Sequence, residues 1–378
     1  MPTPHEIATR RAPKPTRDLR EPRLAIALSG GGYRAMLFHL GALKRLNEFG
    51  LLSVMDRMST VSGGSITGAV LAIRWPDLNF DAAGVAAGFD RVEKDVFEIA
   101  DRTIDIRSGI LGLLPGTTGA AQVAKALDGP LDHKMLADVP GERPRFTFNT
   151  TNMQSGNLFR WSSSYAADWE LGQIVSPNIS LATVIAASAA FPPILSPLRI
   201  SVPGTLVDFH STAPAPVMDP PDRLWLTDGG VYDNLGIENL KSFHTVLASD
   251  GGAPFASTTR LRANIGSQAL RTMFLLNEQV GRQRKRGLVH ELQTGQRLGA
   301  LWTISTKMAD YTAGGTLPCP DEAIVRLAAV RTRLKRLPRQ VKYQLANWGY
   351  ASADAAVRSF VEPTLPPPVG FPYPGGVG

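Results

Sequence analysis

The chain has 378 residues, of which 43% are hydrophobic and 19% charged, values typical of a globular protein with a substantial core. It has one cysteine, Cys319, which excludes an intrachain disulfide, and no stretch reaches the roughly 18 apolar residues of a membrane-spanning helix. The formal net charge of +7 indicates contact with an anionic partner, and both nucleic acid and an anionic membrane surface fit that charge.

The two ends of the chain differ in composition from its middle. Residues 1–22 contain arginines and prolines but no apolar segment of the kind found in a secretory signal, so we expect a mobile basic arm. Residues 361–378 are rich in Pro and Gly and predict an extended or disordered tail. One catalytic domain is expected over residues 23–360. The missing signal and the single cysteine favour a cytoplasmic protein that touches membranes only peripherally.

Two strand–turn–helix units follow the basic arm. A short apolar run at Arg23–Leu28 predicts a buried parallel strand, and helical spacing of apolar residues follows at Tyr33–Phe49. A second strand at Met55–Val61 and a helix at Gly64–Ile73 repeat the pattern. Strand and helix alternating within about fifty residues predict an α/β fold with right-handed crossovers.

The rest of the chain continues this mixed pattern. Strands are predicted over 146–152 and 157–162, as an antiparallel pair, and over 224–227, 245–249 and 301–306. Helices are predicted over 82–100, 181–190, 268–297, 321–337 and 340–360. An apolar segment at 110–116 is interpreted either as a lid or membrane-touching loop or as a buried turn. The buried turn is favoured because exposed apolar patches are uncommon.

Each of the first two strands ends on a turn of small residues. The first turn, Ser29–Arg34, carries three glycines before a helix, which directs bare backbone N–H groups at an anion. The second turn, Thr60–Ser65, places serines on a sharp turn that opens a helix, as hydroxyl nucleophiles are presented. Together the turns predict a serine hydrolase whose oxyanion hole precedes its nucleophile.

The nucleophile is predicted to be Ser62. It is the first residue after the apolar run and two glycines follow it, whereas Ser65 falls in the first helical turn, where serine is often only a cap. The strict G-x-S-x-G pattern is absent from both positions. Around Ser62 the first glycine is replaced by Thr60.

The candidate base is an aspartate. None of the six histidines lies in a motif typical of a catalytic triad, and His39, inside the first helix, is interpreted as a packed residue. Both Asp228 and Asp250 end a predicted strand and are followed by two glycines, a pair of residues that also forms ordinary turns. Asp228 is preferred because an ordered segment follows it, whereas a loop follows Asp250. Asp250 remains an alternative candidate for the base. A carboxylate with a pKa of about 3.9 becomes a workable base when desolvation raises that pKa.

Three blocks in this order resemble the patatin-like phospholipases, and the first block is also similar to the catalytic domain of the cytosolic phospholipase A2 enzymes. The blocks are SGGGYRAM at 29–36, VSGGS at 61–65 and DGG at 228–230. The resemblance spans roughly residues 24–360. It implies a three-layer α/β/α fold with a mostly parallel central sheet. It also implies a Ser62–Asp228 dyad without histidine and an oxyanion hole formed by Gly30, Gly31 and Gly32.

The resemblance further implies hydrolysis of fatty-acyl esters, with a phospholipid or another lipid ester as substrate and an anionic membrane surface as peripheral partner. No metal-ligand spacing is seen, and the mechanism needs no cofactor. Arg34 is predicted to bind a substrate phosphate or to brace the glycine turn, against the alternative of a surface salt bridge.

Two other functions are weighed against hydrolysis. The missing first glycine of the serine turn is compatible with a catalytically weak lipid-binding or regulatory protein on the same fold. Nucleic-acid binding is not expected, because the basic residues are not interleaved with aromatic residues that would stack on bases.

Overall fold

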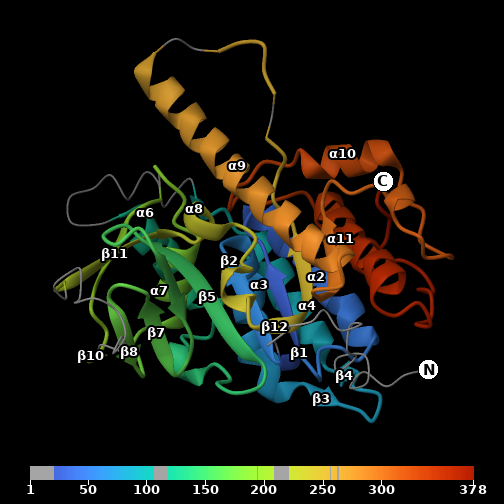
Figure 1. Ribbon diagram of the computed structural model, residues 1–378, viewed down its shortest axis with the longest axis horizontal. Coiled ribbons are helices and arrows are strands. Elements are labelled where there is room, and N and C mark those ends of the chain that lie inside the picture. Colours follow the sequence, from blue (N-terminus) through green and yellow to red (C-terminus); the bar gives the residue numbers. More distant parts are fainter. Residues whose placement is uncertain (1–20, 106–117, 194, 208–220, 256, 262–263) are drawn as a thin grey trace.

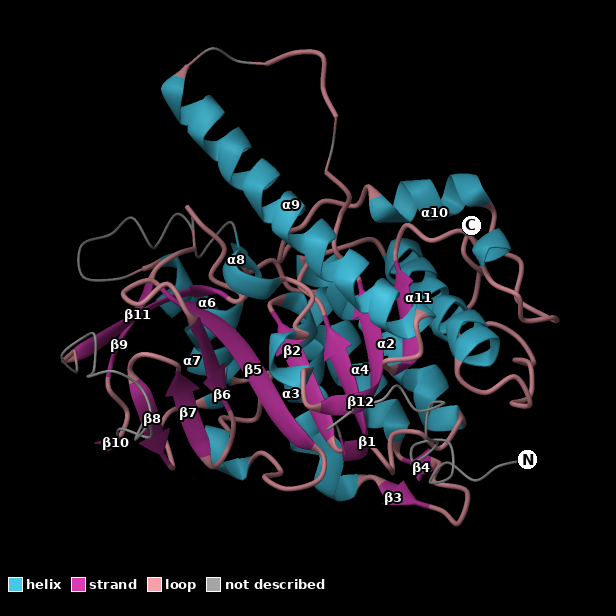
Figure 2. Ribbon diagram, in the orientation of Figure 1, coloured by secondary structure: helices cyan, strands magenta, loops and turns pink. Residues whose placement is uncertain are grey.

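The computed structural model describes residues 21–105, 118–193, 195–207, 221–255, 257–261 and 264–378. Most of the predicted basic arm and the apolar segment at 110–116 lie outside these residues. One large mixed sheet runs through the molecule with helices on both of its faces, which confirms the predicted layered α/β fold (Figures 1 and 2).

The large sheet is built from eleven strands. They are β1 (Glu21–Leu28), β2 (Arg57–Val61), β5 (Arg145–Asn152), β6 (Leu158–Trp161), β7 (Tyr165–Asp168), β8 (Gly172–Val175), β9 (Leu198–Ser201), β10 (Leu206–Val207), β11 (Arg223–Asp228), β12 (Phe243–Asp250) and β13 (Leu298–Thr303). Strands β5, β2, β1, β12 and β13 pair in parallel, in that order. On the other side of β5, strands β6, β7, β8 and β10 add antiparallel pairs.

The helices cover the two faces of this sheet. They are α2 (Gly32–Glu48), α3 (Gly63–Arg74), α4 (Phe89–Ala100), α6 (Gly119–Asp128), α7 (Leu181–Ser188), α8 (Gly230–Asp233), α9 (Ile265–Gln293), α10 (Asp321–Ala328) and α11 (Arg339–Phe360). Alternate residues of β1 face opposite layers: Ile26 packs in the core that contains α2, α3 and α11, whereas Ala25 packs in a smaller core with Leu288 of α9. In the described part of the chain, no helix combines the length and apolarity needed to cross a bilayer.

Two predicted helices are shorter than expected. The helix expected from residue 82 begins at Phe89, because the preceding residues form a small two-stranded sheet, β3 (Asn79–Phe80) and β4 (Ala86–Ala87), and Gly88 turns the chain with φ 85°. The helix expected over 321–337 ends at Ala328. The following segment leaves the helix and brings the backbone of Arg333 against the N-terminus of α2, where its carbonyl accepts the N–H of Tyr33 at 3.0 Å.

The C-terminal segment 361–378 packs against the helices and forms turns and bends without a helix or strand of its own. The side-chain amide of Asn347 donates to the carbonyls of Tyr373 at 2.9 Å and Gly376 at 2.7 Å. The Tyr373 hydroxyl hydrogen-bonds Glu93 on α4, and Val377 is buried.

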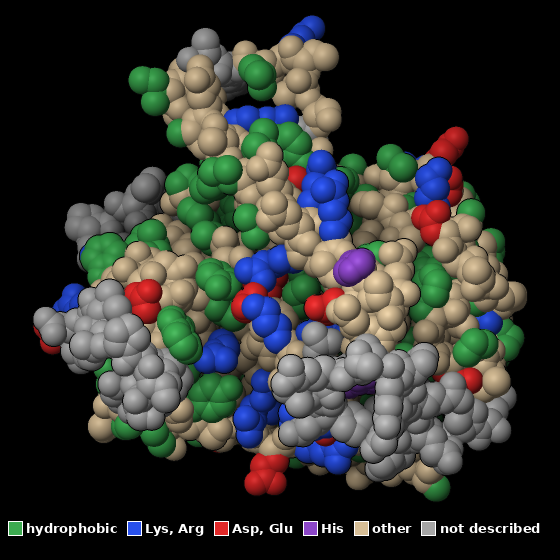
Figure 3. All heavy atoms as spheres, viewed as in Figure 1, with side chains coloured by type: hydrophobic (Ala, Val, Ile, Leu, Met, Phe, Trp, Pro, Cys, Tyr) green, Lys and Arg blue, Asp and Glu red, His purple; other side chains and the backbone are tan. Residues whose placement is uncertain are grey.

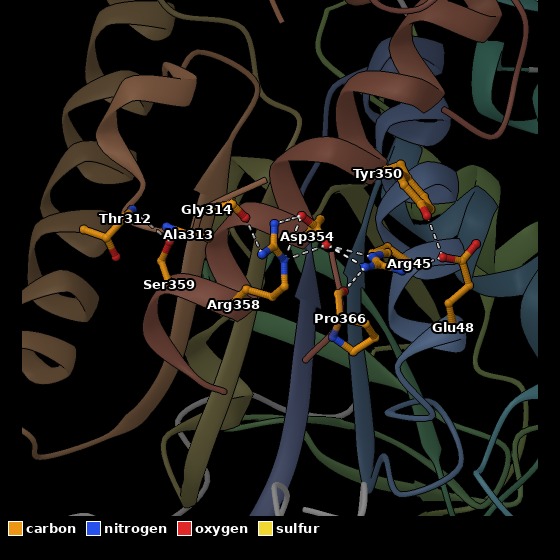
Figure 4. A network of polar contacts seen from close by, with 10 residues as sticks. All are labelled: Arg45, Glu48, Thr312, Ala313, Gly314, Tyr350, Asp354, Arg358, Ser359 and Pro366. Carbon is orange, nitrogen blue, oxygen red and sulfur yellow. Dashed lines mark hydrogen bonds and ion pairs between the residues drawn. The ribbon is translucent and has the colours of Figure 1, made fainter. Parts of the chain in front are cut away.

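A buried ionic network joins α2 to α11 (Figure 4). Asp354, which is 1% exposed, accepts hydrogen bonds from Arg45 of α2 at 2.8–2.9 Å and from Arg358, one turn along α11, at 2.7 Å. Arg45 also donates to Glu48 and to the carbonyl of Pro366, both at 2.7 Å. The Asp354 carboxylate is therefore the shared counter-charge of two buried arginines, and Glu48 supplies a second negative charge.

We predict that Asp354→Ala lowers the free energy of unfolding by about 3–5 kcal/mol, because it leaves two buried guanidinium groups without their shared counter-charge. Urea denaturation at neutral pH measures the effect. Glu98→Ala removes one partner of an exposed ion pair with Lys94 and should cost at most about 1 kcal/mol. Equal losses in the two variants would contradict this account of the network.

Candidate active site

Ser62 occupies a sharp turn between β2 and α3. Its backbone has φ 51° and ψ −117°, in a region that non-glycine residues rarely adopt and that costs on the order of 1–3 kcal/mol. Such strain at the end of a buried strand places the serine hydroxyl at the carboxyl edge of the sheet. The predicted turn geometry is therefore present at Ser62, although the chain has threonine in place of the first glycine.

Strand β5 explains how Asp228 reaches Ser62 from far along the chain. Val61, the last residue of β2, pairs with Asn149 of β5, and Asp228, the last residue of β11, pairs with the next residue, Thr150. Because β6 occupies the other edge of β5, β2 and β11 share one edge and end facing each other. The two strands thus deliver Ser62 and Asp228 to the same point.

The Ser62 side chain lies close enough to the Asp228 carboxylate to affect its pKa. Asp228 is 2% exposed, and its Oδ1 also accepts the N–H of Gly230 at 2.7 Å. Burial raises the pKa of Asp228 to about 7, while the hydrogen bond from Gly230 and the nearby Ser62 side chain act in the opposite direction. A carboxylate with this pKa can both accept and return a proton near neutral pH.

The glycine turn lies directly beside the serine turn. Gly31 and Gly32 have φ values of 147° and 61°, and a Cβ on Gly63 would stand 2.2 Å from the carbonyl oxygen of Gly32. Within the described chain, the N–H groups of Gly31 and Gly32 have no hydrogen-bond acceptor. The N–H of Gly30 instead donates to the Asn234 carbonyl at 3.0 Å. The Gly30 N–H is therefore already engaged within the protein, and the oxyanion hole of Gly30, Gly31 and Gly32 stays a prediction.

A set of buried hydroxyl groups holds the serine turn in place. The Ser188 hydroxyl accepts the backbone N–H of Ser62 at 3.0 Å and donates to the Asn149 carbonyl at 2.7 Å. Since that uses the only Ser188 hydrogen, Ser65, whose oxygen lies 2.8 Å away, must donate to Ser188. Ser65 is fully buried and also contacts the Thr60 hydroxyl at 3.0 Å. Ser65 therefore has a supporting position, and Ser62 borders the cavity.

The end of α7 positions the aspartate as well. The N–H of Asp228 donates to the Ala190 carbonyl at 3.0 Å, and the N–H of Gly229 donates to the Ser188 carbonyl at 3.3 Å. One short segment after α7 thus fixes the backbone of both Ser62 and Asp228.

Thr60, the residue that replaces glycine in the serine turn, is accommodated by a glycine on α3. A Cβ on Gly68 would stand 2.8 Å from the methyl carbon of Thr60, closer than packed carbon atoms approach. The Thr60 hydroxyl meanwhile contacts the supporting hydroxyl of Ser65. The extra side chain at residue 60 therefore takes the space that glycine leaves at residue 68.

We predict that Gly68→Ala destabilises the protein by about 1–3 kcal/mol through overpacking, although the same change in an open helix would stabilise it by about 1 kcal/mol. In a Thr60→Gly background the contact is gone, so the alanine should lose its penalty. A double-mutant cycle by thermal denaturation measures this coupling. Stabilisation by Gly68→Ala alone would show that the two positions do not compete for space.

Asp250, the alternative base, is already paired. It is 4% exposed, its Oδ2 lies 3.0 Å from Nζ of Lys285, and its Oδ1 accepts the N–H of Gly252 at 2.9 Å. Asp228 instead lies beside Ser62. The geometry favours Asp228 over Asp250.

Arg34 and His39 are both fully buried on α2. Arg34 donates through Nε to the Gly251 carbonyl at 2.9 Å and through Nη1 to the Val330 carbonyl, which braces the loops around the glycine turn and excludes a surface salt bridge. Burial lowers the pKa of Arg34 to about 10, so it stays charged at neutral pH. Burial lowers the pKa of His39 to about 4, and its Nε2 donates to the Ser29 carbonyl at 2.9 Å. His39 is thus a neutral, packed residue, as predicted.

A cavity of about 450 Å³ opens above these groups. Its polar floor contains Ser62, Asp228 and the glycine turn, and its apolar walls include Phe191, Leu195 and Phe274. No histidine of the described chain lines it. The described residues also contain no cluster of three His, Cys, Asp or Glu side chains that could hold a metal ion.

Comparison with known proteins agrees with this arrangement. The family model for patatin-like phospholipase matches residues 26–241, more than half of the chain and all of the segments that form the serine, glycine and aspartate turns. The chain belongs to the patatin-like phospholipase family.

Individual relatives differ in how much of this patatin-like chain they match. A protein of Saccharomyces cerevisiae described as "Putative meiotic phospholipase SPO1" is 46% identical over 44 residues, which are 12% of this chain and 7% of that one. Human GIVD cytosolic phospholipase A2, solved with methyl gamma-linolenyl fluorophosphonate and terbium chloride, is similar in fold with a TM-score of 0.51. It is 12% identical, and the match covers 93% of this chain and 60% of the human one. The patatin-like chain thus spans less than two thirds of either relative.

Proposed function

We propose that the protein is a serine lipid acyl hydrolase of phospholipase A type, which cleaves fatty-acyl esters of phospholipids through a Ser62–Asp228 dyad. The observation that carries the proposal is a serine on a strained backbone turn beside a buried aspartate whose pKa is raised to about 7, next to two unused backbone N–H groups. Membership of the patatin-like phospholipase family supports the same reaction.

In the first step the Ser62 oxygen attacks the ester carbonyl carbon and its proton passes to the Asp228 carboxylate. The carbonyl oxygen becomes negative, and the N–H groups of Gly31 and Gly32 are placed to stabilise it. The positive end of α3 favours the serine oxygen as it loses its proton. The bond from the carbonyl carbon to the alcohol oxygen then breaks, and Asp228 returns the proton to the departing lysophospholipid.

In the second step water hydrolyses the acyl-serine. Asp228 accepts a proton from the water as the water oxygen bonds to the acyl carbon, and the Ser62 oxygen leaves with that proton to give a free fatty acid. Arg34 keeps the glycine turn in position through its two carbonyl contacts, and its Nη2 has no partner among the described residues. A substrate phosphate is the charge that would complete this group.

Mass spectrometry of lipid products tests the proposal. Wild-type protein incubated with mixed phospholipid vesicles should release fatty acid and lysophospholipid in equal amounts, and Ser62→Ala should release neither. A catalytically weak lipid-binding protein on this fold would instead bind the vesicles without releasing product. Release that survives Ser62→Ala would refute the assignment of the nucleophile.

A further inference from the structure

The N-terminal half of α9 projects from the body of the protein (Figure 1). Seven large hydrophobic side chains in and just before this part of the helix are exposed, and we refer to them as the apolar ridge: Leu261, Ile265, Leu270, Phe274, Leu275, Leu276 and Val280. Ile265 is 88% exposed and Leu276 is 56% exposed. Exposed apolar side chains gathered in this way on one helix indicate a binding surface.

The charges of α9 are concentrated beyond the apolar ridge. Residues 265–281 contain one arginine and one glutamate, whereas four of the five residues 282–286 are basic. Arg284 and Lys285 pair with acidic groups of the body, while Arg282 and Arg286 are exposed. Figure 3 shows hydrophobic side chains on the projection, with Lys and Arg side chains at its tip and along it, and a further group of them where it joins the body. The projection thus carries exposed apolar side chains together with cations, a combination that suits an anionic bilayer surface.

The apolar ridge is continuous with the wall of the cavity that contains Ser62. Phe274 belongs to both, and its ring stacks on that of Phe191 with centroids 5.6 Å apart and planes 18° apart. Three further residues of α9, spaced one helical turn apart, line the same cavity: Asn277, Gly281 and Lys285. An acyl chain that moves from the ridge into the cavity would therefore remain on apolar side chains.

We infer that the apolar ridge inserts into the surface of an anionic phospholipid bilayer and seats the cavity mouth against it, so that lipid enters past Phe274. This inference rests on the proposed function for the nature of the substrate. The partner of the apolar ridge is the bilayer rather than a second copy of the chain. The basic residues behind the ridge would repel the same residues of a second copy, and they would attract anionic headgroups.

The test compares Ile265→Gln/Leu276→Gln with the control Val175→Gln/Val207→Gln. The control removes two exposed valines from β8 and β10, at the other end of the sheet from α9 (Figure 1). None of the four residues lines the cavity. Sedimentation with vesicles of phosphatidylcholine and phosphatidylglycerol should show about tenfold or more weaker binding by the ridge variant and unchanged binding by the control. Hydrolysis of a soluble short-chain ester should be equal in wild type and both variants.

Vesicle binding that is the same in wild type and ridge variant would overturn the inference, as would wild-type protein that does not sediment with vesicles. A wild-type dimer that the ridge substitutions dissociate, measured by light scattering without lipid, would also overturn it and assign the ridge to a second copy. If soluble ester is not cleaved by any form but vesicle binding still depends on the ridge, the proposed reaction fails and the inferred surface stands.

Discussion

Replacement of Ser62 by alanine is expected to lower ester hydrolysis by a factor of about 10⁴–10⁶, the loss typical of removing a serine nucleophile. The hydroxyl is the atom that becomes acylated, and no other serine side chain lines the cavity among the described residues. Initial rates with a soluble ester and with phospholipid vesicles measure the loss on two substrates that present the ester differently.

Ser65→Ala is the matched control for this prediction. It removes a buried hydroxyl three residues away that supports Ser188, and so perturbs the turn without touching the attacking atom. We expect a loss of about tenfold to a hundredfold, with circular dichroism unchanged in both variants. A larger loss of activity in Ser65→Ala than in Ser62→Ala would show that Ser62 is not the nucleophile.

Asp228→Asn should reduce hydrolysis by about 10⁴, because an amide cannot accept the Ser62 proton. In the wild type the carboxylate must be ionised to act as base, so the rate should rise with pH around a midpoint near 7. Asp250→Asn keeps the base and should lose less than about a hundredfold, with the same midpoint. A wild-type rate that does not change between pH 5 and pH 9 would argue against Asp228 as the base.

Asp228→Asn should also stabilise the fold at high pH. The pKa of Asp228 is raised from 3.8 to about 7 in the folded state, so the stability that the neutral carboxyl contributes is complete below pH 3.8 and is lost as pH rises through 7. Asparagine stays neutral at every pH and avoids that loss, which is at most about 4 kcal/mol at pH 8. Urea denaturation at pH 5 and pH 8 should therefore show an advantage for the variant that grows with pH. An advantage that shrinks as pH rises would contradict the buried-charge explanation.

The parts of the site that depend on local sequence were predictable. A buried strand followed by a glycine-rich turn and a helix occurs at residues 21–48 and again at 57–74, and both units are confirmed within a few residues. Alternation of side chains also predicted the antiparallel pair β5 and β6. These signals are local because strand burial and helix periodicity are decided by neighbouring residues.

The contacts between distant segments were not predictable from those patterns. The support of Ser62 by Ser188 and the space that Gly68 leaves for Thr60 depend on which helix packs behind the turn. The use of the Gly30 N–H by Asn234 depends on a loop about 200 residues further along the chain. The short strands β7 to β10 carry weak alternation and are stabilised mainly by their neighbours in the sheet.

The most direct test of the account is to react the protein with a fluorophosphonate and locate the adduct by peptide mass spectrometry. A single adduct on Ser62 is predicted in the wild type and in a Ser65→Ala variant, formed faster as pH rises through 7, with labelling strongly reduced in Asp228→Asn. An adduct on any other residue, or no adduct while lipid hydrolysis continues, would contradict a dyad of Ser62 and Asp228.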